Sequence, residues 1–554
     1  MKRTMVRLAW LVFLILFLAV ADRASAQVQV DSTDPNAAPQ GTTNLNVTIN
    51  GNGFKRGATA KWFVTGTTNP GGVTVNSTTF RSSTQLVANI TIAGDAVTAK
   101  FDVQVLSAGR TGKGTDLFAV TAKGTPLGCS TVGTPGGFTL VTELNPVQPS
   151  GAALITAGKF GNAIRVRPLD LNGDHVVDTL VTFVTSGGGV TYLFMLDPVT
   201  GLVQTTNPVT GAAWQNPVPL LAGVRGIIAA VGDVNGDGIP DFVMADQGST
   251  VGTYLFVGSI TSSYTLSYTA YQIPHADAAG GYWAIALAMG DLDNDGSDEI
   301  VIGSRPARGE KKLPAVFIYK FTAGSAVLTG SIADPTGNLG SYFGGAIAIG
   351  NINNGVPGNE LVVGAKSANT TGVVYVYPYP ATQSTYFTLP GSGSEFGLAV
   401  GLGEVTGDTV PDLVVFNSTE AFLYRGPVFS GETFSNQLFP APGLDGYWAR
   451  TNNDIGTMLT TGAVAVGAGT ATTDQSCGSS QGGVGAVHLF TAPFATSQNP
   501  NYVFQPPDLV GSTQFQYGSG VGLVPGYPFL IIGEHLRTVG TTGSAGQVYV
   551  YKKY

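Results

Sequence analysis

Short apolar runs, separated by Gly, Asn, Asp, Ser and Pro, follow one another along most of this chain. Within many runs polar and apolar residues alternate, which is the pattern of a half-buried β-strand. After residue 26 no long stretch shows the spacing of an amphipathic helix, which repeats about every 3.6 residues. The pattern therefore predicts an all-β protein with many tight turns.

The region 28–121 alternates regularly and is expected to form a small β-sandwich of two sheets. Its clearest strand candidates are 44–51, 58–64, 84–92, 100–107 and 116–121. The following stretch, 122–136, is rich in Gly, Thr and Pro and is predicted to be a linker.

From residue 137 to the end, at 554, the chain repeats one unit, and an internal repeat of this length decides the architecture. An apolar strand recurs at 178–183, 241–246, 299–304, 360–365, 412–417, 463–468 and 529–534. An aromatic-rich strand follows each of them, at 191–196, 253–258, 315–320, 372–377, 421–426, 485–490 and 546–551. The seven copies predict seven units of about four strands, the content of a propeller blade.

A seven-bladed β-propeller behind a small immunoglobulin-like sandwich is the predicted fold class, and a linear solenoid is the alternative. The chain ends after the third strand of the seventh unit, while the strand 138–144 precedes the first unit without a sheet of its own. If 138–144 supplies the missing strand of the last blade, the ring closes and loses an exposed sheet edge. This arrangement favours the propeller.

The N-terminus, the net charge and the cysteines indicate where the protein is located and which partners it can have. Residues 1–26 combine a basic start, an apolar run and Ala24-Ser25-Ala26, which predicts a cleaved secretory signal and no membrane insertion afterwards. We therefore expect a secreted or cell-surface protein. Its net charge of −8 argues against nucleic acid as a partner. Cys129 and Cys477 could form one disulfide beside the last blade.

Four loops between the predicted strands share a nine-residue frame with oxygen-bearing side chains at positions 1, 3, 5 and 9. The candidate ligands, including the carbonyl of position 7, are Asp170, Asn172, Asp174, Val176 and Asp178; Asp233, Asn235, Asp237, Ile239 and Asp241; Asp291, Asp293, Asp295, Ser297 and Glu299; and Glu404, Thr406, Asp408, Val410 and Asp412.

Calcium is the cation that this frame suits, because Ca²⁺ takes six to eight oxygen ligands at about 2.3–2.6 Å. Clustered carboxylates also repel one another unless a cation is bound. An EF-hand is excluded, since it needs a Glu at position 12 and a following helix, whereas Val181, Met244, Ile302 and Val415 stand there within strands. We expect about three Ca²⁺ sites and count a fourth candidate; polar turns without metal are the alternative.

The loop frame, followed by an apolar strand and Gly, resembles the FG-GAP/VCBS repeats. The Phe-Gly element of that family stands at 342–350, 395–401 and 159–164. The resemblance implies the seven-bladed propeller of integrin α subunits and of many secreted bacterial proteins, with Ca²⁺ in the loops. His175 and Thr409 replace the usual Gly, and the fourth copy, 351–360, has an extra residue and a single carboxylate.

The N-terminal region has a resemblance of its own. The segments 34–42, 49–54 and 58–64, with the closing "FDVQV" at 101–105, are similar to the IPT/TIG family of immunoglobulin-like domains. The resemblance covers about 90 residues, which is an ordinary domain size.

No catalytic set emerges from the sequence, so we lean toward a binding protein and leave enzymatic activity open. The four histidines share no short metal-binding spacing. Aromatic residues in "GYWAI" (281–285) and "GYWAR" (446–450) either stack on a ligand or, as we favour, pack between blades. We expect recognition or adhesion, with a protein or glycan as ligand. A carbohydrate-active lyase or hydrolase and a structural part of a surface assembly are the alternatives.

Overall fold

The computed structural model describes residues 27–39, 42, 45–93, 96–97, 99–121, 134–144, 160–186, 190–220, 228–245, 252–276, 281–307, 309–354, 358–389, 391, 393–439, 453–458, 461–468, 485–506, 517–535 and 546–554. Strands and turns make up this part of the chain, and no helix occurs in it, which confirms the predicted all-β class. The chain divides into two compact units, Met1–Leu127 and Gly128–Tyr554.

The first unit contains two four-stranded sheets around one core. One sheet has the order β1-β3-β6-β5, with β1 (Gln29–Asp34), β3 (Leu45–Asn52), β6 (Gln85–Ile92) and β5 (Val73–Ser82). The other has the order β2-β8-β7-β4, with β2 (Ala37–Pro39), β8 (Arg110–Thr121), β7 (Ala99–Ser107) and β4 (Thr59–Val64).

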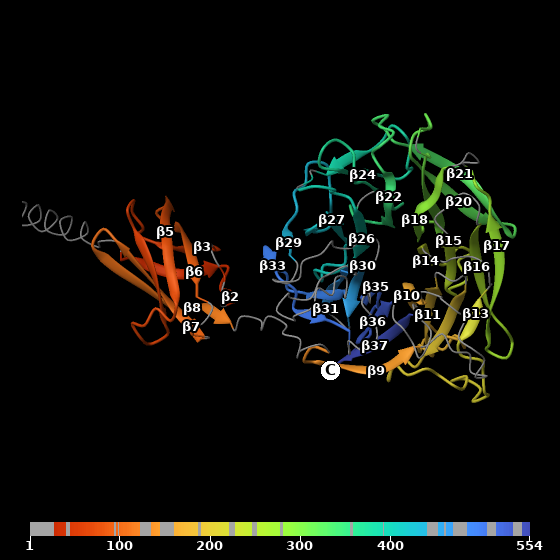
Figure 1. Ribbon diagram of the computed structural model, residues 1–554, viewed down its shortest axis with the longest axis horizontal. Helices are drawn as coiled ribbons and strands as arrows, with labels where there is room; N and C mark the ends of the chain where they lie inside the picture. Colours follow the sequence, from red (N-terminus) through yellow and green to blue (C-terminus); the bar gives the residue numbers. More distant parts are fainter. Residues whose placement is uncertain are drawn as a thin grey trace, which may run out of the picture. The chain divides into compact units, whose positions relative to one another are not determined.

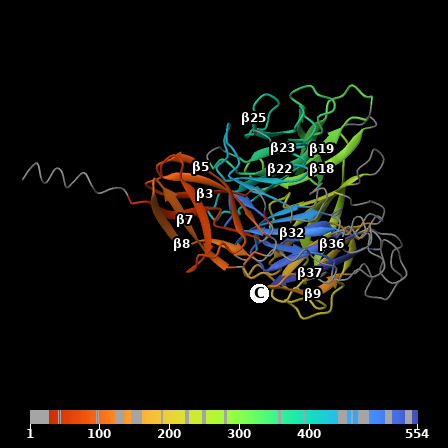
Figure 2. The ribbon, with the colours of Figure 1, turned by 60° about the vertical axis from the view of Figure 1, so that its left-hand side comes forward.

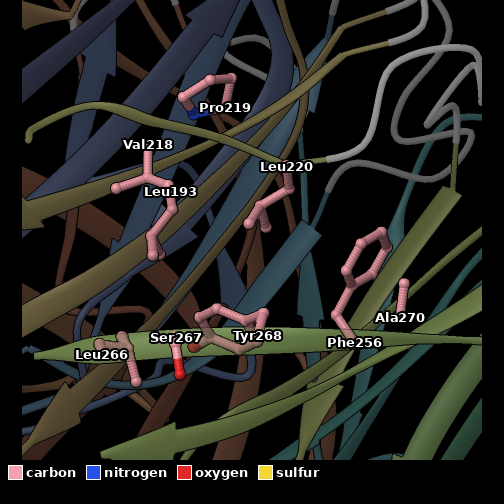
Figure 3. A pocket seen from close by; sticks show the side chains of 9 residues that line it. All are labelled: Leu193, Val218, Pro219, Leu220, Phe256, Leu266, Ser267, Tyr268 and Ala270. Carbon is pink, nitrogen blue, oxygen red and sulfur yellow. The ribbon is translucent and has the colours of Figure 1, made fainter. Parts of the chain in front are cut away.

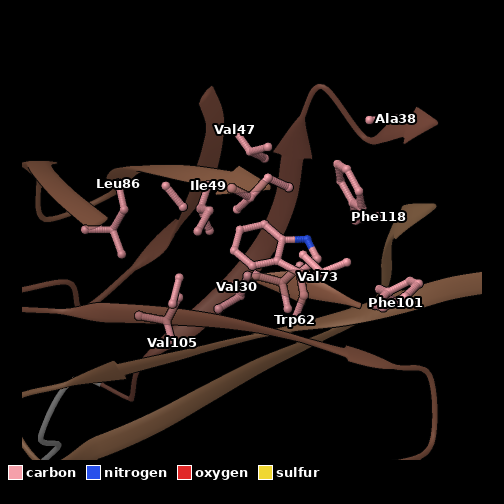
Figure 4. Close-up of a cluster of buried hydrophobic side chains, with 14 of the residues drawn as sticks. Val30, Ala38, Val47, Ile49, Trp62, Val73, Leu86, Phe101, Val105 and Phe118 are labelled. Carbon is pink, nitrogen blue, oxygen red and sulfur yellow. The ribbon is translucent and has the colours of Figure 1, made fainter. Parts of the chain in front are cut away.

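Trp62 lies at the centre of this core and is 1% exposed (Figure 4). Its ring meets that of Phe118 edge to face, with 6.0 Å between the ring centres. Residues of β6 are buried at every second position, as the polar–apolar alternation predicts for a strand with one face on the core. The sandwich is thus held by apolar side chains that alternate inward from both sheets.

The second unit contains seven sheets among its described residues. The first four are β10 (Phe160–Leu169), β11 (Thr179–Ser186), β12 (Thr191–Leu196) and β13 (Val218–Leu220); β14 (Ile228–Gly232), β15 (Asp241–Ala245), β16 (Thr253–Ile260) and β17 (Leu266–Ile273); β18 (Tyr282–Gly290), β19 (Glu299–Arg305), β20 (Ala315–Thr322) and β21 (Ser325–Ala333); and β22 (Phe343–Gly350), β23 (Glu360–Ala365), β24 (Val373–Tyr377) and β25 (Phe387–Leu389).

The other three sheets complete the unit. They are β26 (Ala399–Gly403), β27 (Asp412–Phe416), β28 (Ala421–Tyr424), β29 (Asn436–Leu438) and β33 (Ser497–Gln498); β30 (Asn453–Met458), β31 (Thr461–Ala468), β32 (Ala486–Thr491) and β34 (Tyr502–Phe504); and β35 (Tyr517–Leu523), β36 (Phe529–Glu534), β37 (Gln547–Lys553) and β9 (Phe138–Leu144). We number these sheets one to seven in this order. In the seventh, β9 pairs antiparallel with β37, so a strand that precedes the first sheet completes the last one (Figure 2).

The first strands of the sheets lie toward the middle of the second unit and the last ones toward its rim (Figure 1). Each first strand contacts the first strand of the next sheet, and β35 of the seventh sheet contacts β10 of the first. The second strand of each sheet lies between two strands and under the neighbouring sheets, so its residues are buried almost throughout. This position explains why these strands are continuous apolar runs. Separate, mostly antiparallel sheets in this order are consistent with a propeller.

Glycine brings neighbouring sheets into backbone contact. A Cβ on Gly303 of β19 would lie 2.0 Å from the carbonyl oxygen of Gly344, at the start of the fourth sheet. A Cβ on Gly533 of β36 would lie 2.0 Å from the carbonyl oxygen of Gly161, at the start of the first sheet. Gly161 and Gly344 both have positive φ. The seventh sheet therefore approaches the first as closely as the third approaches the fourth, and a side chain would prevent either contact.

Several predicted features lie outside the described residues. They are the signal at 1–26, Cys129 and Cys477 with their disulfide, and "GYWAR" (446–450). Among the residues that the structure does describe, no helix is long and apolar enough to cross a membrane.

Candidate metal centre

The acidic loops all join the first strand of a sheet to its second strand. They occupy 170–178, 233–241, 291–299 and 404–412 in the first, second, third and fifth sheets, and 351–360 in the fourth. Strand pairing places the ninth residue opposite the last residue of the first strand, as in the pairs Gly232 with Asp241 and Gly290 with Glu299. The loops thus leave equivalent corners of their sheets, as the repeat predicted.

The backbone of the loops is the same even where the sequence departs from the usual Gly. His175 and Thr409 have φ values of 67° and 77°, in the left-handed region that Gly238 and Gly296 occupy in the second and third loops. That region is unfavourable for residues with a side chain and easy for Gly. His175 and Thr409 therefore accept a strained conformation that keeps the shape of the loop.

The first residue of the loop folds the turn by accepting backbone hydrogen bonds. In the second loop Asp233 accepts from the N–H groups of Gly236 at 2.8 Å and Gly238 at 2.7 Å. In the third loop Asp291 accepts from Asp295 at 3.0 Å and Gly296 at 2.8 Å. Such bonds are those of a polar turn, and they shape the loop without requiring a metal.

The first loop shows the same arrangement at Asp170. Burial acts to raise the pKa of Asp170, but backbone hydrogen bonds from His175 and Gly173 outweigh it, so its pKa lies below the usual value. Asp170 is therefore ionised at neutral pH and available to a cation.

The last residue of each loop, the ninth in four loops and the tenth in the longer fourth loop, has a structural task that the sequence did not reveal. Its carboxylate accepts a hydrogen bond from the backbone N–H of the second loop residue. The bonds are those of Leu171 to Asp178 (2.8 Å), Val234 to Asp241 (2.7 Å), Leu292 to Glu299 (2.7 Å), Ile352 to Glu360 (2.9 Å) and Val405 to Asp412 (2.9 Å). One carboxylate oxygen thus anchors each loop to its second strand.

The partner of the other carboxylate oxygen differs between the Asp residues and the Glu residues at this position. In the second loop Oδ1 of Asp241 accepts from Gly258 of the third strand at 2.7 Å, and Asp412 accepts from Gly426 at 3.1 Å. Oε1 of Glu360 is buried and accepts no hydrogen bond, and Oε1 of Glu299 faces the ammonium of Lys320 at 3.1 Å. At the two Glu residues this oxygen therefore accepts no backbone N–H of the third strand and can face a cation.

Negative charge accumulates in the second loop. Asp241 is 0% exposed, and burial raises its pKa to about 7 although Gly258 and Val234 donate hydrogen bonds to it. The nearby charges of Asp237 and Asp233 raise the pKa of Asp241 further. A cation in the loop would offset this repulsion and favour the ionised carboxylate.

In the third loop carboxylate oxygens of Asp291, Asp293 and Glu299 lie within 4.8 Å of one another. Within the described ranges no other group of at least three such residues meets this spacing. Ca²⁺ binds oxygen ligands of this type, and three carboxylates leave room for the carbonyl and water ligands that it also takes. This cluster could hold a metal ion.

Neighbouring loops are also connected, through a residue that the frame did not single out. Asp298 accepts a hydrogen bond from the backbone N–H of Asp233 at 2.8 Å and donates its own N–H to the carbonyl of Asp233 at 2.7 Å. Asn359 likewise donates its side-chain amide to the carbonyl of Asp291 and its N–H to that of Leu292. The sequence did contain a signal for this contact: a polar residue, Asp298 or Asn359, directly before the last residue of the loop. In the second and fifth loops this position is Pro240 and Pro411.

The aromatic residues of "GYWAI" take different positions. Trp283 is 1% exposed, donates from Nε1 to Oγ1 of Thr253 at 2.9 Å and packs with Phe317. Packing between sheets, the favoured interpretation, is therefore correct for Trp283. Tyr282 is 42% exposed, and the guanidinium carbon of Arg305 lies 3.9 Å from the centre of its ring.

A pocket of about 340 Å³ lies between the outer strands of the first and second sheets (Figure 3). Its lining is Leu193, Val218, Pro219, Leu220, Phe256, Leu266, Ser267, Tyr268 and Ala270. The lining holds no charged side chain, so the pocket suits apolar groups. It touches the second loop only through Tyr268, whose hydroxyl donates to the carbonyl of Pro240 at 3.0 Å.

His488 lies inside β32, opposite Val466 of β31 and Val503 of β34, and is 1% exposed. Burial lowers its pKa to about 4. The unfolded chain, with a pKa of about 6.5 for His, takes up this proton first as the pH falls. We expect His488 to reduce the free energy of unfolding by about 2–3 kcal/mol between pH 7 and pH 4.5.

Urea denaturation at both pH values checks this effect, with His488→Phe as the comparison. Other acidic groups titrate in both proteins, so the difference between them isolates His488. An equal loss of stability in the two proteins would contradict a buried, neutral His488.

Comparison with known proteins identifies part of the second unit. A family described as FG-GAP-like repeat matches residues 233–302, which run from the second acidic loop through β15 to β18 and the third acidic loop into β19. This match confirms the predicted FG-GAP resemblance for that stretch.

Among solved structures, one similar chain is that of the exotype rhamnogalacturonan lyase YesX. It is 12% identical, with a TM-score of 0.30 over 86% of this chain and 91% of that chain. A likeness this low carries no inference about the activity of the present protein.

Proposed function

We propose that this protein is an exported recognition protein in which calcium stabilises a seven-bladed propeller behind an immunoglobulin-like domain. The observation that carries the proposal is the repeated acidic loop, which leaves the same corner of successive sheets with the same backbone conformation. Oxygen-bearing side chains at positions 1, 3, 5 and 9, mostly carboxylates, give Ca²⁺ the oxygen ligands that it prefers.

The propeller follows from the order of the sheets. Seven sheets whose first strands contact one another in sequence, with β35 next to β10, support a closed ring of seven blades. A linear solenoid would leave the first and last sheets apart. For the first unit, two four-stranded sheets around Trp62 support the immunoglobulin-like assignment that the IPT/TIG resemblance suggested.

The residues that would hold calcium belong to the first, second, third and fifth loops. Position 1 supplies a carboxylate that already lies in the turn. Positions 5 and 9 of the same nine-residue frame supply the other carboxylates. Bound Ca²⁺ would supply charge neutralisation and fix the loops, which connect neighbouring blades through Asp298 and Asn359. The calcium is in this proposal a structural ion, and ligand recognition is the task of the protein surface.

A row of tyrosines and cations offers a surface for recognition. It consists of Tyr282, Arg305, Tyr342 and Lys366, with Glu395 bound to Lys366 at 2.7 Å. Arg305 lies between the rings of Tyr282 and Tyr342, at 3.9 Å and 4.6 Å from their centres. Because Tyr282 begins β18 whereas the acidic loop follows its end, the row lies at the opposite end of the sheet from the calcium loops.

This row suits a ligand with anionic and planar or sugar-like groups. Tyrosine and arginine are enriched among the residues that dominate binding energy at interfaces. The rings of Tyr282 and Tyr342 hold the guanidinium of Arg305 between them, so little side-chain entropy of Arg305 is lost on binding. A protein with acidic side chains or an acidic glycan fits this chemistry, and nucleic acid is disfavoured by the net charge of −8.

A glycan array and a protein-binding screen, both in calcium, test the proposal. We expect binding without release of product, and we expect Tyr282→Ala/Arg305→Ala to weaken it at least tenfold, which is about 1.4 kcal/mol. Tyr264→Ala, at another exposed tyrosine, is the control and should keep its affinity. Melting curves confirm that both variants fold.

The outcomes separate the alternatives. Released oligosaccharide would overturn a purely binding role in favour of a carbohydrate-active enzyme. Retention of full affinity in Tyr282→Ala/Arg305→Ala would overturn the assignment of the binding surface. Absence of any glycan or protein ligand would favour a structural part of a surface assembly.

A further inference from the structure

Lys320, on the third strand of the third sheet, reaches into the acidic loop of the same sheet. Its Nζ lies 2.6 Å from Oδ2 of Asp293 and 2.7 Å from Oδ2 of Asp295. It also lies 3.1 Å from Oε1 of Glu299. The side chain of Lys320 is 23% exposed, so these three contacts replace most of its hydration. An ammonium group with three donors matches three carboxylates.

Strand register places Lys320 at this point. Ile300 pairs with Tyr319, so the next residue of β20, Lys320, falls opposite Glu299, the ninth residue of the loop. In the second sheet Phe242 pairs with Phe256, which places Val257 opposite Asp241. An apolar side chain cannot supply a cation, so the second loop has no equivalent of Lys320 on its third strand.

The third loop is also the one with an additional acid. Its third position is Asp293, where the first and second loops have Asn172 and Asn235 and the fifth has Thr406. At positions 1, 3, 5 and 9 it therefore has four carboxylates, and each of the other three loops has three; its further acid, Asp298 at position 8, is bonded to Asp233 of the second loop. The charge of Lys320 offsets the extra carboxylate at position 3, so these four positions together with Lys320 have the same net charge as the same positions of the second loop.

The oxygens that Lys320 contacts are those that a metal ion would need. Asp293 and Glu299 both belong to the cluster whose oxygens lie within 4.8 Å of one another. Glu299 is 3% exposed; its Oε2 accepts the hydrogen bond from Leu292, and its Oε1 faces the ammonium of Lys320 at 3.1 Å. An ammonium and a divalent cation cannot share these oxygens, because both would have to lie within about 3 Å of them and like charges repel.

We infer that Lys320 is an internal counter-cation of the third acidic loop, which a divalent cation must displace. The inference rests on the proposed calcium binding of the loops. It makes the third loop, despite its four carboxylates, a weaker calcium site than the second. It also means that the third loop keeps its conformation when calcium is removed, because the tethered ammonium stays.

Calcium titration of the full chain by calorimetry tests this, with Lys320→Met to remove the charge and keep the length of the side chain. We expect one binding step to tighten at least tenfold while the others stay unchanged. Lys311→Met, which removes an exposed charge that precedes β20 at the other end of the sheet, is the control and should leave every step as it is. Asp291→Asn, added to Lys320→Met, should abolish the tightened step and so assign it to the third loop.

Melting in excess chelator gives a second readout that does not depend on calcium binding. Lys320→Met should melt below the wild type, since four carboxylates then repel one another without a cation. The double variant Lys320→Met/Asp293→Asn gives the third loop the Asn that the second loop has at position 3. It should recover most of the lost stability.

The possible failures are distinct. If other loops bind calcium and Lys320→Met leaves every affinity unchanged or weaker, the counter-cation role is overturned and the proposed calcium binding stands. If neither the wild type nor Lys320→Met binds calcium, the counter-cation role and the proposed calcium binding are both overturned.

Discussion

Removal of calcium by excess chelator should lower the melting temperature of the second unit by about 9 °C relative to the protein at a calcium concentration of about one hundred times Kd. At that concentration one site contributes about 2.7 kcal/mol of stability, and three sites about 8 kcal/mol. A unit the size of Gly128–Tyr554 has an unfolding entropy of about 0.9 kcal/mol per kelvin. Dividing the stabilisation of about 8 kcal/mol by this entropy gives the expected shift of about 9 °C.

The physical basis is the charge of the loops. Without a cation, the buried Asp241 faces Asp237 and Asp233, and burial together with these charges raises its pKa to about 7. Folding therefore costs either the proton uptake of a carboxylate or the repulsion between carboxylates. A bound cation removes this cost in the folded state only, because the unfolded chain has no assembled loop.

Scanning calorimetry with chelator and with calcium checks the shift. Asp233→Asn/Asp237→Asn should lose about one third of it, or about 3 °C, because the second loop no longer binds. Asp31→Asn, in the first unit, is the matched control and should retain the whole shift. Coinciding melting curves in chelator and in calcium would refute the loops as metal sites.

Gly533→Ala is expected to destabilise the protein by about 3 kcal/mol or more, since its Cβ would lie 2.0 Å from the carbonyl oxygen of Gly161. A backbone oxygen cannot rotate away as the end of a side chain can, so the seventh sheet must move away from the first. Gly303→Ala meets the oxygen of Gly344 at the same 2.0 Å and should lose a similar free energy of unfolding.

Gly330→Ala is the control for both variants. Gly330 lies in β21, and its Cβ would be 3.7 Å from Cδ1 of Ile318, an ordinary contact. We expect a change within about 1 kcal/mol there. Urea denaturation of the three variants provides the comparison. A Gly533→Ala protein as stable as the wild type, beside a destabilised Gly303→Ala, would mean an open array and would exclude the closed ring.

Local pattern was sufficient for the strands and the loop frame. The apolar runs at 241–246 and 299–304 correspond to β15 (Asp241–Ala245) and β19 (Glu299–Arg305), because a strand buried on both faces needs an unbroken apolar run. The pairing of β9 with β37 follows the position that the sequence proposed for 138–144. The apolar periodicity gave no information about the role of Asp298, because its hydrogen bonds to Asp233 of the preceding sheet leave no periodic signal.

The sequence by itself determined the all-β class, the repeat and the position of the acidic loops, because strand periodicity and turn chemistry are properties of neighbouring residues. Only the tertiary structure decided what faces each loop. Lys320 is 21 residues after Glu299 in the sequence, and the register of β20 against β19 brings it there. Register also makes the ninth carboxylate an anchor for Leu292 and Val234 and buries Trp283. Contacts between strands depend on pairing across the sheet, which the order of residues along one strand does not encode.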